Sequence, residues 1–264
     1  MNKTLRLAQI SDLHYCREPG GLLDSPVVTD HTLKQVLDRL ALWAPDWVIA
    51  TGDLAQDPEP VTYLRLRKTF AHYPFRVHPL PGNHDDPFLM TRMLGFGDGE
   101  PVKHLVAGAW QLLLLDSTLP GHQQGRLAPE ELSWLDETLA TNPGQHALIC
   151  LHHHPLPVGS PWMDRIALAN AGELLECLTD HDQVRGVAFG HIHQAFESEW
   201  RGIRFFGTPA TCVQFRPNSH DLIIDKTPPA FRRFELHPDG RLESFVEYLS
   251  ESGAGADREE KRRA

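Results

Sequence analysis

The sequence predicts an α/β fold in which two mixed sheets pack together between flanking helices, a four-layer α/β/β/α sandwich. Two observations predict it. The first two thirds of the chain alternate between short apolar runs and amphipathic stretches with apolar residues three and four positions apart. The last third carries short strand-like segments and no helical pattern. We expect one domain over residues 1–249 and a disordered tail over 250–264, which has no apolar face.

Each strand predicted in the first part is a short apolar run. These strands are expected at residues 5–10, 46–51, 75–80, 110–116, 146–151 and 184–189. Amphipathic helices are expected between several of them, at residues 32–43, 60–73, 129–141 and 171–181. Pro60 and Pro129 suit the first turn of a helix, where a missing N–H costs little. Further short strands are expected at residues 195–200, 203–208, 211–215, 231–236 and 242–249.

Composition and charge exclude several classes of partner. The formal net charge of −10 opposes binding to nucleic acid or to an anionic membrane surface. No apolar run approaches the ~18 residues of a membrane-spanning helix, and the first residues lack the features of a signal peptide. The four cysteines have no C-x-x-C spacing, which is typical of reduced thiols. We therefore expect a cytoplasmic protein with a small-molecule partner, as either a monomer or a dimer.

Polar residues that can bind metals follow five of the predicted strands. Taken singly, each motif is weak evidence, because Asp-x-His is common at turns and Gly, Asn and Asp are ordinary turn formers. However, open α/β sheets place their ligand sites at the carboxyl ends of strands, and a His-x-His pair in an extended segment points both rings one way. Together the motifs predict one shared metal site. They are Asp12-Leu13-His14, Gly52-Asp53, Gly82-Asn83-His84-Asp85, His152-His153-His154 and Gly190-His191-Ile192-His193.

The types of ligand predict two metal ions. Carboxylate, amide and imidazole groups together suit manganese, iron or zinc. Seven ligands are too many for one tetrahedral zinc, and they suit two ions about 3.5–4 Å apart that share a carboxylate and leave positions for water and substrate. Asp53 is the expected bridge. His152 is the expected ligand of its motif because it directly follows the buried strand, with His153 as the alternative. The predicted ligands are Asp12, His14, Asp53, Asn83, His152, His191 and His193.

These motifs, in this order, resemble the full signature of the calcineurin-like metallophosphoesterases. The segments LLLLDS, HHHPLP, NAGELLE, GHIHQ and TPATCVQF further resemble the class III bacterial 3′,5′-cyclic-AMP phosphodiesterases, over roughly residues 5–248. The resemblance implies that one ion is held by Asp12, His14, Asp53 and His193. It implies that the other is held by Asp53, Asn83, His152 and His191.

The resemblance also implies a mechanism, with iron and manganese as the expected ions and zinc as an alternative. A metal-bridging hydroxide would attack the phosphorus of cyclic AMP in line and give 5′-AMP. Because the ribose 3′-oxygen is a poor leaving group, a proton donor should help, and His84 is expected to contact the phosphate and supply the proton. Asp85 would orient His84. The expected catalytic residues are His84 and Asp53, and the residues expected to border the substrate are His14, Asp53, Asn83, His84, His152 and His193.

The sequence leaves other functions open. The main alternative is a phosphodiesterase for another small diester, such as a glycerophosphodiester. A protein phosphatase is less favoured because no set of arginines surrounds the motifs. A non-catalytic scaffold is disfavoured because every ligand is present. Residues 162–164 and 211–215 are candidate walls for a nucleotide base, although core packing is the better interpretation of both.

Overall fold

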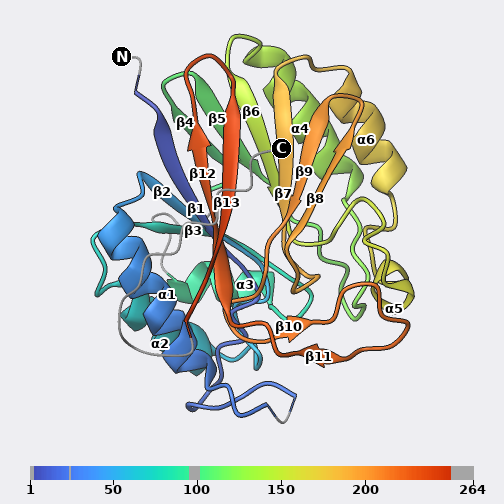
Figure 1. The fold of residues 1–264 in the computed structure, drawn as a ribbon. Helices are drawn as coiled ribbons and strands as arrows, with labels where there is room; N and C mark the ends of the chain where they lie inside the picture. The colour runs from blue at the N-terminus through green and yellow to red at the C-terminus, as the bar shows by residue number, and fades with distance from the viewer. Residues whose placement is uncertain (1–2, 24, 95–101, 251–264) are drawn as a thin grey trace.

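Two mixed β-sheets form the centre of the molecule (Figure 1). The structure is a computed structural model that describes residues 3–23, 25–94 and 102–250. The predicted tail therefore lies outside the described residues, apart from Ser250. None of the helices in these ranges has the length and apolar character needed to cross a bilayer.

The first sheet has the strand order β13-β12-β1-β2-β3. Its strands β1, β2 and β3 run parallel, whereas β12 is antiparallel to both β1 and β13. Three of the predicted metal-binding motifs follow the three parallel strands. The strands are β1 (Leu5–Ile10), β2 (Trp47–Thr51), β3 (Val77–Leu80), β12 (Ala230–Leu236) and β13 (Leu242–Tyr248).

The second sheet has the order β4-β5-β6-β7-β9-β8. Strands β5, β6, β7 and β9 are parallel, and the edge strands β4 and β8 are antiparallel to their neighbours. The other two motifs follow β6 and β7. The strands are β4 (His104–Ala107), β5 (Trp110–Leu114), β6 (His146–Leu151), β7 (Val184–Phe189), β8 (Phe196–Trp200) and β9 (Ile203–Gly207). A separate pair is formed by β10 (Gln214–Phe215) and β11 (Ile224–Asp225).

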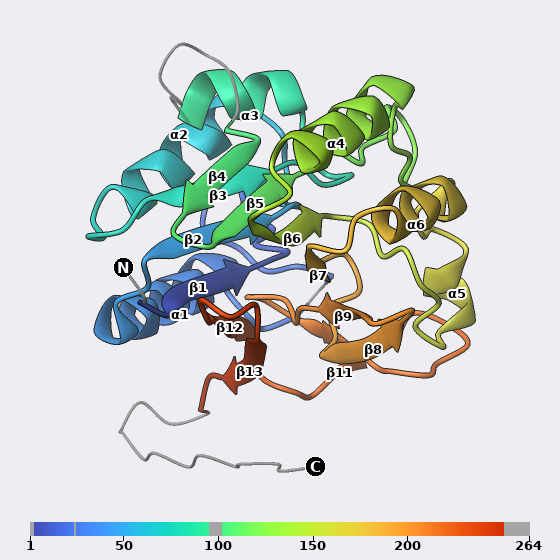
Figure 2. The same cartoon turned by 90° about the horizontal axis from the view of Figure 1, so that it is seen from above.

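Three clusters of buried apolar residues fill the spaces between four layers (Figure 2). One joins the first sheet to α1, α2 and α3, one lies between the sheets, and one joins the second sheet to α4 and α6. The predicted four-layer sandwich is confirmed. The helices are α1 (Thr29–Trp43), α2 (Pro60–Phe70), α3 (Pro87–Leu94), α4 (Pro129–Thr141), α5 (Pro161–Asp164) and α6 (Ala171–Thr179).

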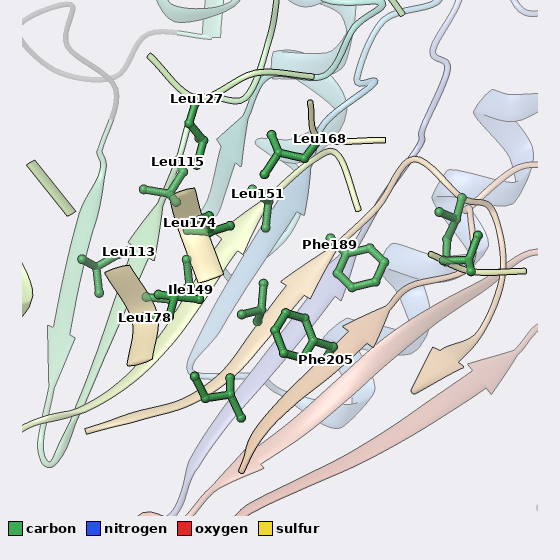
Figure 3. Packing of buried hydrophobic residues seen from close by; sticks show 14 of the residues in the cluster. Leu113, Leu115, Leu127, Ile149, Leu151, Leu168, Leu174, Leu178, Phe189 and Phe205 are labelled. Carbon is green, nitrogen blue, oxygen red and sulfur yellow. The ribbon is translucent and has the colours of Figure 1, made fainter. Parts of the chain in front are cut away.

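The alternation of side chains along the strands creates these layers. In β6, Ile149 belongs to the cluster under the helices, while its neighbours Leu148 and Cys150 belong to the cluster between the sheets. Figure 3 shows Ile149 beside Leu174 and Leu178 of α6. Because both faces of β6 are buried, its sequence is a continuous apolar run rather than an alternating one.

Most predicted elements are present, with ends that differ by a few residues. The strand predicted at 211–215 is wrong over 211–213, because this segment bonds to the loop after β1. The Thr211 backbone N–H donates to the Ser11 carbonyl, and the Cys212 thiol donates to the Asp12 carbonyl. The short elements α3, β4, α5 and β11 were not predicted. They are too short to show a clear hydrophobic period.

A buried arginine connects the two sheets. Arg232 on β12 is fully buried, and its guanidinium donates to the Glu197 carboxylate and the Phe196 carbonyl on β8 and to the Gly207 carbonyl on β9. It also donates to Ser244 Oγ on β13. An always-charged side chain is stable in this position only because oxygen acceptors from both sheets surround it.

We expect Arg232→Ala to lower the free energy of unfolding by about 3–5 kcal/mol, because buried carbonyls lose their donor and a cavity remains. Urea unfolding measures the change. Glu197→Gln is the matched control; since the Glu197 side chain is 48% exposed, its loss of charge should cost no more than about 1 kcal/mol. Equal stability of Arg232→Ala and the unaltered protein would contradict this role.

Candidate metal centre

The five motifs converge from both sheets on one buried centre. Asp12 follows β1 and accepts hydrogen bonds at 3.1 Å from the backbone N–H of His191, which follows β7 of the other sheet. His152, which follows β6, contacts the Thr51 carbonyl at the end of β2. The predicted ligands are all buried except Asn83, which is partly buried. The carboxyl ends of the parallel strands of both sheets therefore face each other here.

One group of ligand atoms surrounds His152 Nε2. This nitrogen lies 3.1 Å from Asn83 Oδ1, 3.2 Å from His191 Nδ1 and 3.5 Å from Asp53 Oδ2. Oxygen and imidazole nitrogen together form the type of site that borderline divalent metals prefer. These four side chains are those expected to hold one of the two ions.

A second group surrounds His193 Nε2. It lies 3.3 Å from His14 Nε2 and 3.4 Å from Asp12 Oδ1, and His14 Nε2 is 3.7 Å from Asp53 Oδ2. The same Asp53 oxygen thus borders both groups. Its other oxygen, Oδ1, accepts the backbone N–H of His84 at 2.8 Å. Asp53 is therefore held by one oxygen and presents the other to both groups.

Hydrogen bonds on the outer side fix the orientation of all four imidazoles. In each ring the outer nitrogen faces a carbonyl oxygen, which only accepts, so the outer nitrogen donates and the inner nitrogen carries a lone pair whenever the ring is neutral. When both rings of a pair are neutral, the lone pairs that face each other at 3.2–3.3 Å repel, and a metal ion or a proton between them removes the repulsion. The donor set therefore fits two metal ions. The pairs are His14 Nδ1 with Gln56 Oε1, His152 Nδ1 with Thr51 O, His191 Nε2 with Ile166 O and His193 Nδ1 with Val213 O.

Burial and mutual charge set the ionisation of these groups. Burial lowers the pKa of His14 to about 4 and that of His191 well below its usual value, so both are neutral near pH 7. Burial opposes ionisation of Asp53, but His152 and His14 hold its pKa well below the ordinary value. The reverse attraction raises the pKa of His152 to about 9 despite its burial. Metal binding at His152 must therefore displace a proton.

The neighbouring histidines have other partners. His153 Nδ1 accepts from the Ser117 hydroxyl at 2.8 Å, while Nε2 donates to the Gln123 carbonyl at 3.2 Å. One His153 nitrogen lies within 4.8 Å of ligand atoms of His152 and His191, but both of its nitrogens already have hydrogen-bond partners, which supports His152 as the ligand. The buried His154 ring stacks on His191 with centroids 5.6 Å apart.

His84 lies on the edge of the cluster. Its half-buried ring meets the His14 ring edge-on, with centroids 4.9 Å apart. Asp85 does not orient that ring as expected. Its carboxylate instead accepts the backbone N–H groups of residues 54, 55 and 82 and the Tyr63 hydroxyl, all at 3.0 Å. Asp85 therefore connects the loop after β2 to the loop after β3.

Four further residues lie around the site: two from the candidate walls for a base, and two that were not singled out from the sequence. Phe215, a candidate wall for a base, is buried and stacks flat on His193 with centroids 4.1 Å apart, and Trp162 packs edge-on against Phe215. Core packing is thus the better interpretation of both side chains. Gln56 could have been suspected from its position three residues after Asp53. The carbonyl of Ile166 gives no signal in a sequence.

The backbone around the ligands is under strain. Asp12, His14, Asp53, His191 and His193 all have positive φ angles, between 42° and 70°, a region that non-glycine residues rarely adopt. Glycine is needed beside them because the loops approach closely. A Cβ on Gly190 would lie 2.0 Å from Ser11 Oγ and 2.9 Å from Asp12 Oδ2. Such clustering of strained residues is typical of functional sites.

Comparison with known proteins is consistent with this geometry. The family model for calcineurin-like phosphoesterase matches residues 5–195, a range that contains all five motifs. The 3′,5′-cyclic adenosine monophosphate phosphodiesterase CpdA of Escherichia coli strain K12 is 38% identical over 252 residues, covering 94% of this chain and 91% of that protein. The protein of the same name from Haemophilus influenzae is 37% identical over 251 residues, covering 94% and 91%.

Among solved structures, the crystal structure of a dimetal phosphatase from Danio rerio has the same fold. The TM-score is 0.64 at 17% sequence identity, and the match covers 93% of this chain and 99% of that chain. At this level of identity the likeness concerns the fold alone.

We expect Gly190→Ala to lose bound metal, because the added methyl group would displace Ser11 or Asp12, and to cost about 1–3 kcal/mol of stability through overpacking. Elemental analysis gives the metal content and urea unfolding gives the stability. The control Gly172→Ala, on α6, meets nothing within 4 Å and should keep its metal. Full metal occupancy in Gly190→Ala would argue against the tight packing described.

Proposed function

The chain belongs to the calcineurin-like phosphoesterase family, and from that premise we propose that it hydrolyses 3′,5′-cyclic AMP to 5′-AMP. Members of this family are hydrolases that use a dinuclear metal centre. The main support for this function is the pair of ligand groups that share Asp53 Oδ2. The nearly full-length similarity to proteins named cyclic-AMP phosphodiesterases supports the choice of substrate.

We assign the ligands of the two ions from the two groups of atoms. Asp12, His14, Asp53 and His193 would hold one ion, and Asp53, Asn83, His152 and His191 the other. Iron and manganese are the proposed ions, with zinc as the alternative, because all three accept mixed oxygen and imidazole ligands. When bound, the two cations activate water and neutralise the phosphoryl oxygens.

The side chains around the ions have distinct tasks. Asp53 keeps the two ligand groups together, and its pKa, held low by His152 and His14, keeps it anionic. In the reaction an oxygen from water bonds to phosphorus as the bond from phosphorus to the ribose 3′-oxygen breaks. We assign His84 to donate a proton to that 3′-oxygen, because its half-buried ring lies on the edge of the cluster beside His14.

The setting of the site supports two further parts of the proposal. The substrate would border His14, Asp53, Asn83, His84, His152 and His193, which lie together around the cluster. A small cyclic nucleotide is a suitable partner for a chain with a net charge of −10, because local cations can attract one phosphate where the whole surface repels polyanions. The free thiols of Cys16, Cys150, Cys177 and Cys212 support a cytoplasmic location.

The purified protein loaded with manganese or iron should hydrolyse cyclic AMP and lose this activity with a chelator. Mutation of a residue that only hydrogen-bonds to a metal ligand typically costs about 10–100-fold in activity. Asn83→Ala should reduce turnover by more than this, because it removes a ligand oxygen. Asn142→Ala, at the far end of α4, is the control and should keep full activity. Cleavage of an aryl phosphodiester without any cleavage of cyclic AMP would instead indicate another small diester as the substrate.

His84→Ala should retain both metals but slow cyclic AMP hydrolysis by about 10²–10⁴-fold, because the 3′-alkoxide leaves poorly without a proton. A bis-aryl phosphodiester should be slowed far less, since its phenolate is a stable leaving group. Steady-state rates on the two substrates, with metal content measured in parallel, make the comparison. Equal slowing of both substrates would remove the acid role from His84.

A further inference from the structure

A second cluster of metal-binding side chains lies on the outer helices, away from the catalytic loops. It consists of Asp136 on α4, Cys177 on α6 and His181 just after α6. One ligand atom from each of the three lies within 4.8 Å of the other two. Neither the proposed reaction nor the binding of cyclic AMP uses any of these residues.

The spacing of these residues follows from helix geometry. Cys177 and His181 are four residues apart, so their side chains lie on one face of a continuing helical turn, in which the His181 N–H bonds to the Leu178 carbonyl. Helix α4 packs against this face through a shared apolar cluster that includes Leu139 and Leu178. Asp136 thereby faces the pair, and its Oδ1 lies 2.7 Å from His181 Nε2.

The electrostatics of the cluster favour a cation. Burial, together with the carboxylates of Asp136 and Asp180, raises the pKa of the Cys177 thiol to about 11. The Asp136 carboxylate, which faces Cys177 and His181, would attract a divalent cation, and a bound cation would stabilise the thiolate. The His181 side chain is only 10% exposed, so its ring is held in place rather than free in solvent.

We propose that Cys177 Sγ, a ring nitrogen of His181 and a carboxylate oxygen of Asp136 bind one thiophilic divalent metal ion, with zinc as the best match. Three protein ligands of these types plus water complete a tetrahedral zinc site. On binding, the thiol proton leaves to solvent and the sulfur bonds to the metal. A hollow of about 460 Å³, lined in part by Asp180, His181 and Asp182, gives solvent access beside the histidine.

This site is separate from the catalytic centre. His181 precedes β7 and His191 follows it, so the length of a six-residue strand, about 20 Å, lies between the two sites. The ion would join α4 to α6 on the outer layer of the second sheet (Figure 2). The proposal therefore does not depend on the proposed reaction, and either can fail without the other.

Cobalt(II) tests the proposal, because cobalt bound to a thiolate gives a near-ultraviolet charge-transfer band. The ligands proposed for the catalytic centre are only oxygen and nitrogen. We expect the manganese- or iron-loaded protein to develop this band and to saturate at one cobalt per chain. Cys177→Ser should lose the band, His181→Ala should need a much higher cobalt concentration, and both should keep cyclic AMP turnover. The matched control Cys16→Ser, at another partly buried cysteine, should keep the band.

A second measurement needs no variant. Added zinc should slow alkylation of Cys177 by iodoacetamide, followed by mass spectrometry, without slowing alkylation of Cys16. Absence of the cobalt band in the unaltered protein, its persistence in Cys177→Ser, or equal alkylation of Cys177 with and without zinc would each overturn the proposal.

Discussion

The whole site depends on the electrostatic compensation of one buried carboxylate and the lone pairs around it. Asp53 Oδ2 borders both His14 Nε2 and His152 Nε2, and each of these nitrogens faces a second imidazole. Without a cation, either a metal ion or the proton on His152, such a concentration of acceptors in a buried space is unstable. Two bound divalent cations would outweigh the charges of Asp12 and Asp53 and would leave a positive centre for a phosphodiester. The charge of Asp53, on the first sheet, therefore acts on the ligands from both sheets.

The fold supplies the rigidity that this centre requires. Positive φ angles at five ligands, among them Asp12 and His191, cost of order 1 kcal/mol or more each and persist only where the surroundings enforce them. Parallel strands buried on both faces enforce them here, because every motif begins where such a strand ends. Arg232 and the apolar cluster between the sheets hold the two halves of the site in register.

The sequence predicts the layers and the ligand-bearing loops because both depend on local patterns. A continuous apolar run such as β6 indicates a strand buried on both faces, and a histidine directly after it lies at the end of that strand. The sequence does not reveal that three motifs come from one sheet and two from the other. It also does not reveal the acceptors that orient the rings, such as the Ile166 carbonyl, or the contacts of Asp85, because these depend on how loops distant in sequence pack together. For the same reason, the sequence does not reveal that Ser117 and Gln123 occupy both ring nitrogens of His153.

Anomalous diffraction from crystals of the active enzyme, recorded at the manganese and iron absorption edges, would locate the metal ions themselves. We expect two peaks per chain in this centre, one on each side of the Asp53 carboxylate, with Asp12 and His193 beside one and Asn83 and His152 beside the other. A single peak, or two peaks that do not share Asp53, would contradict this arrangement.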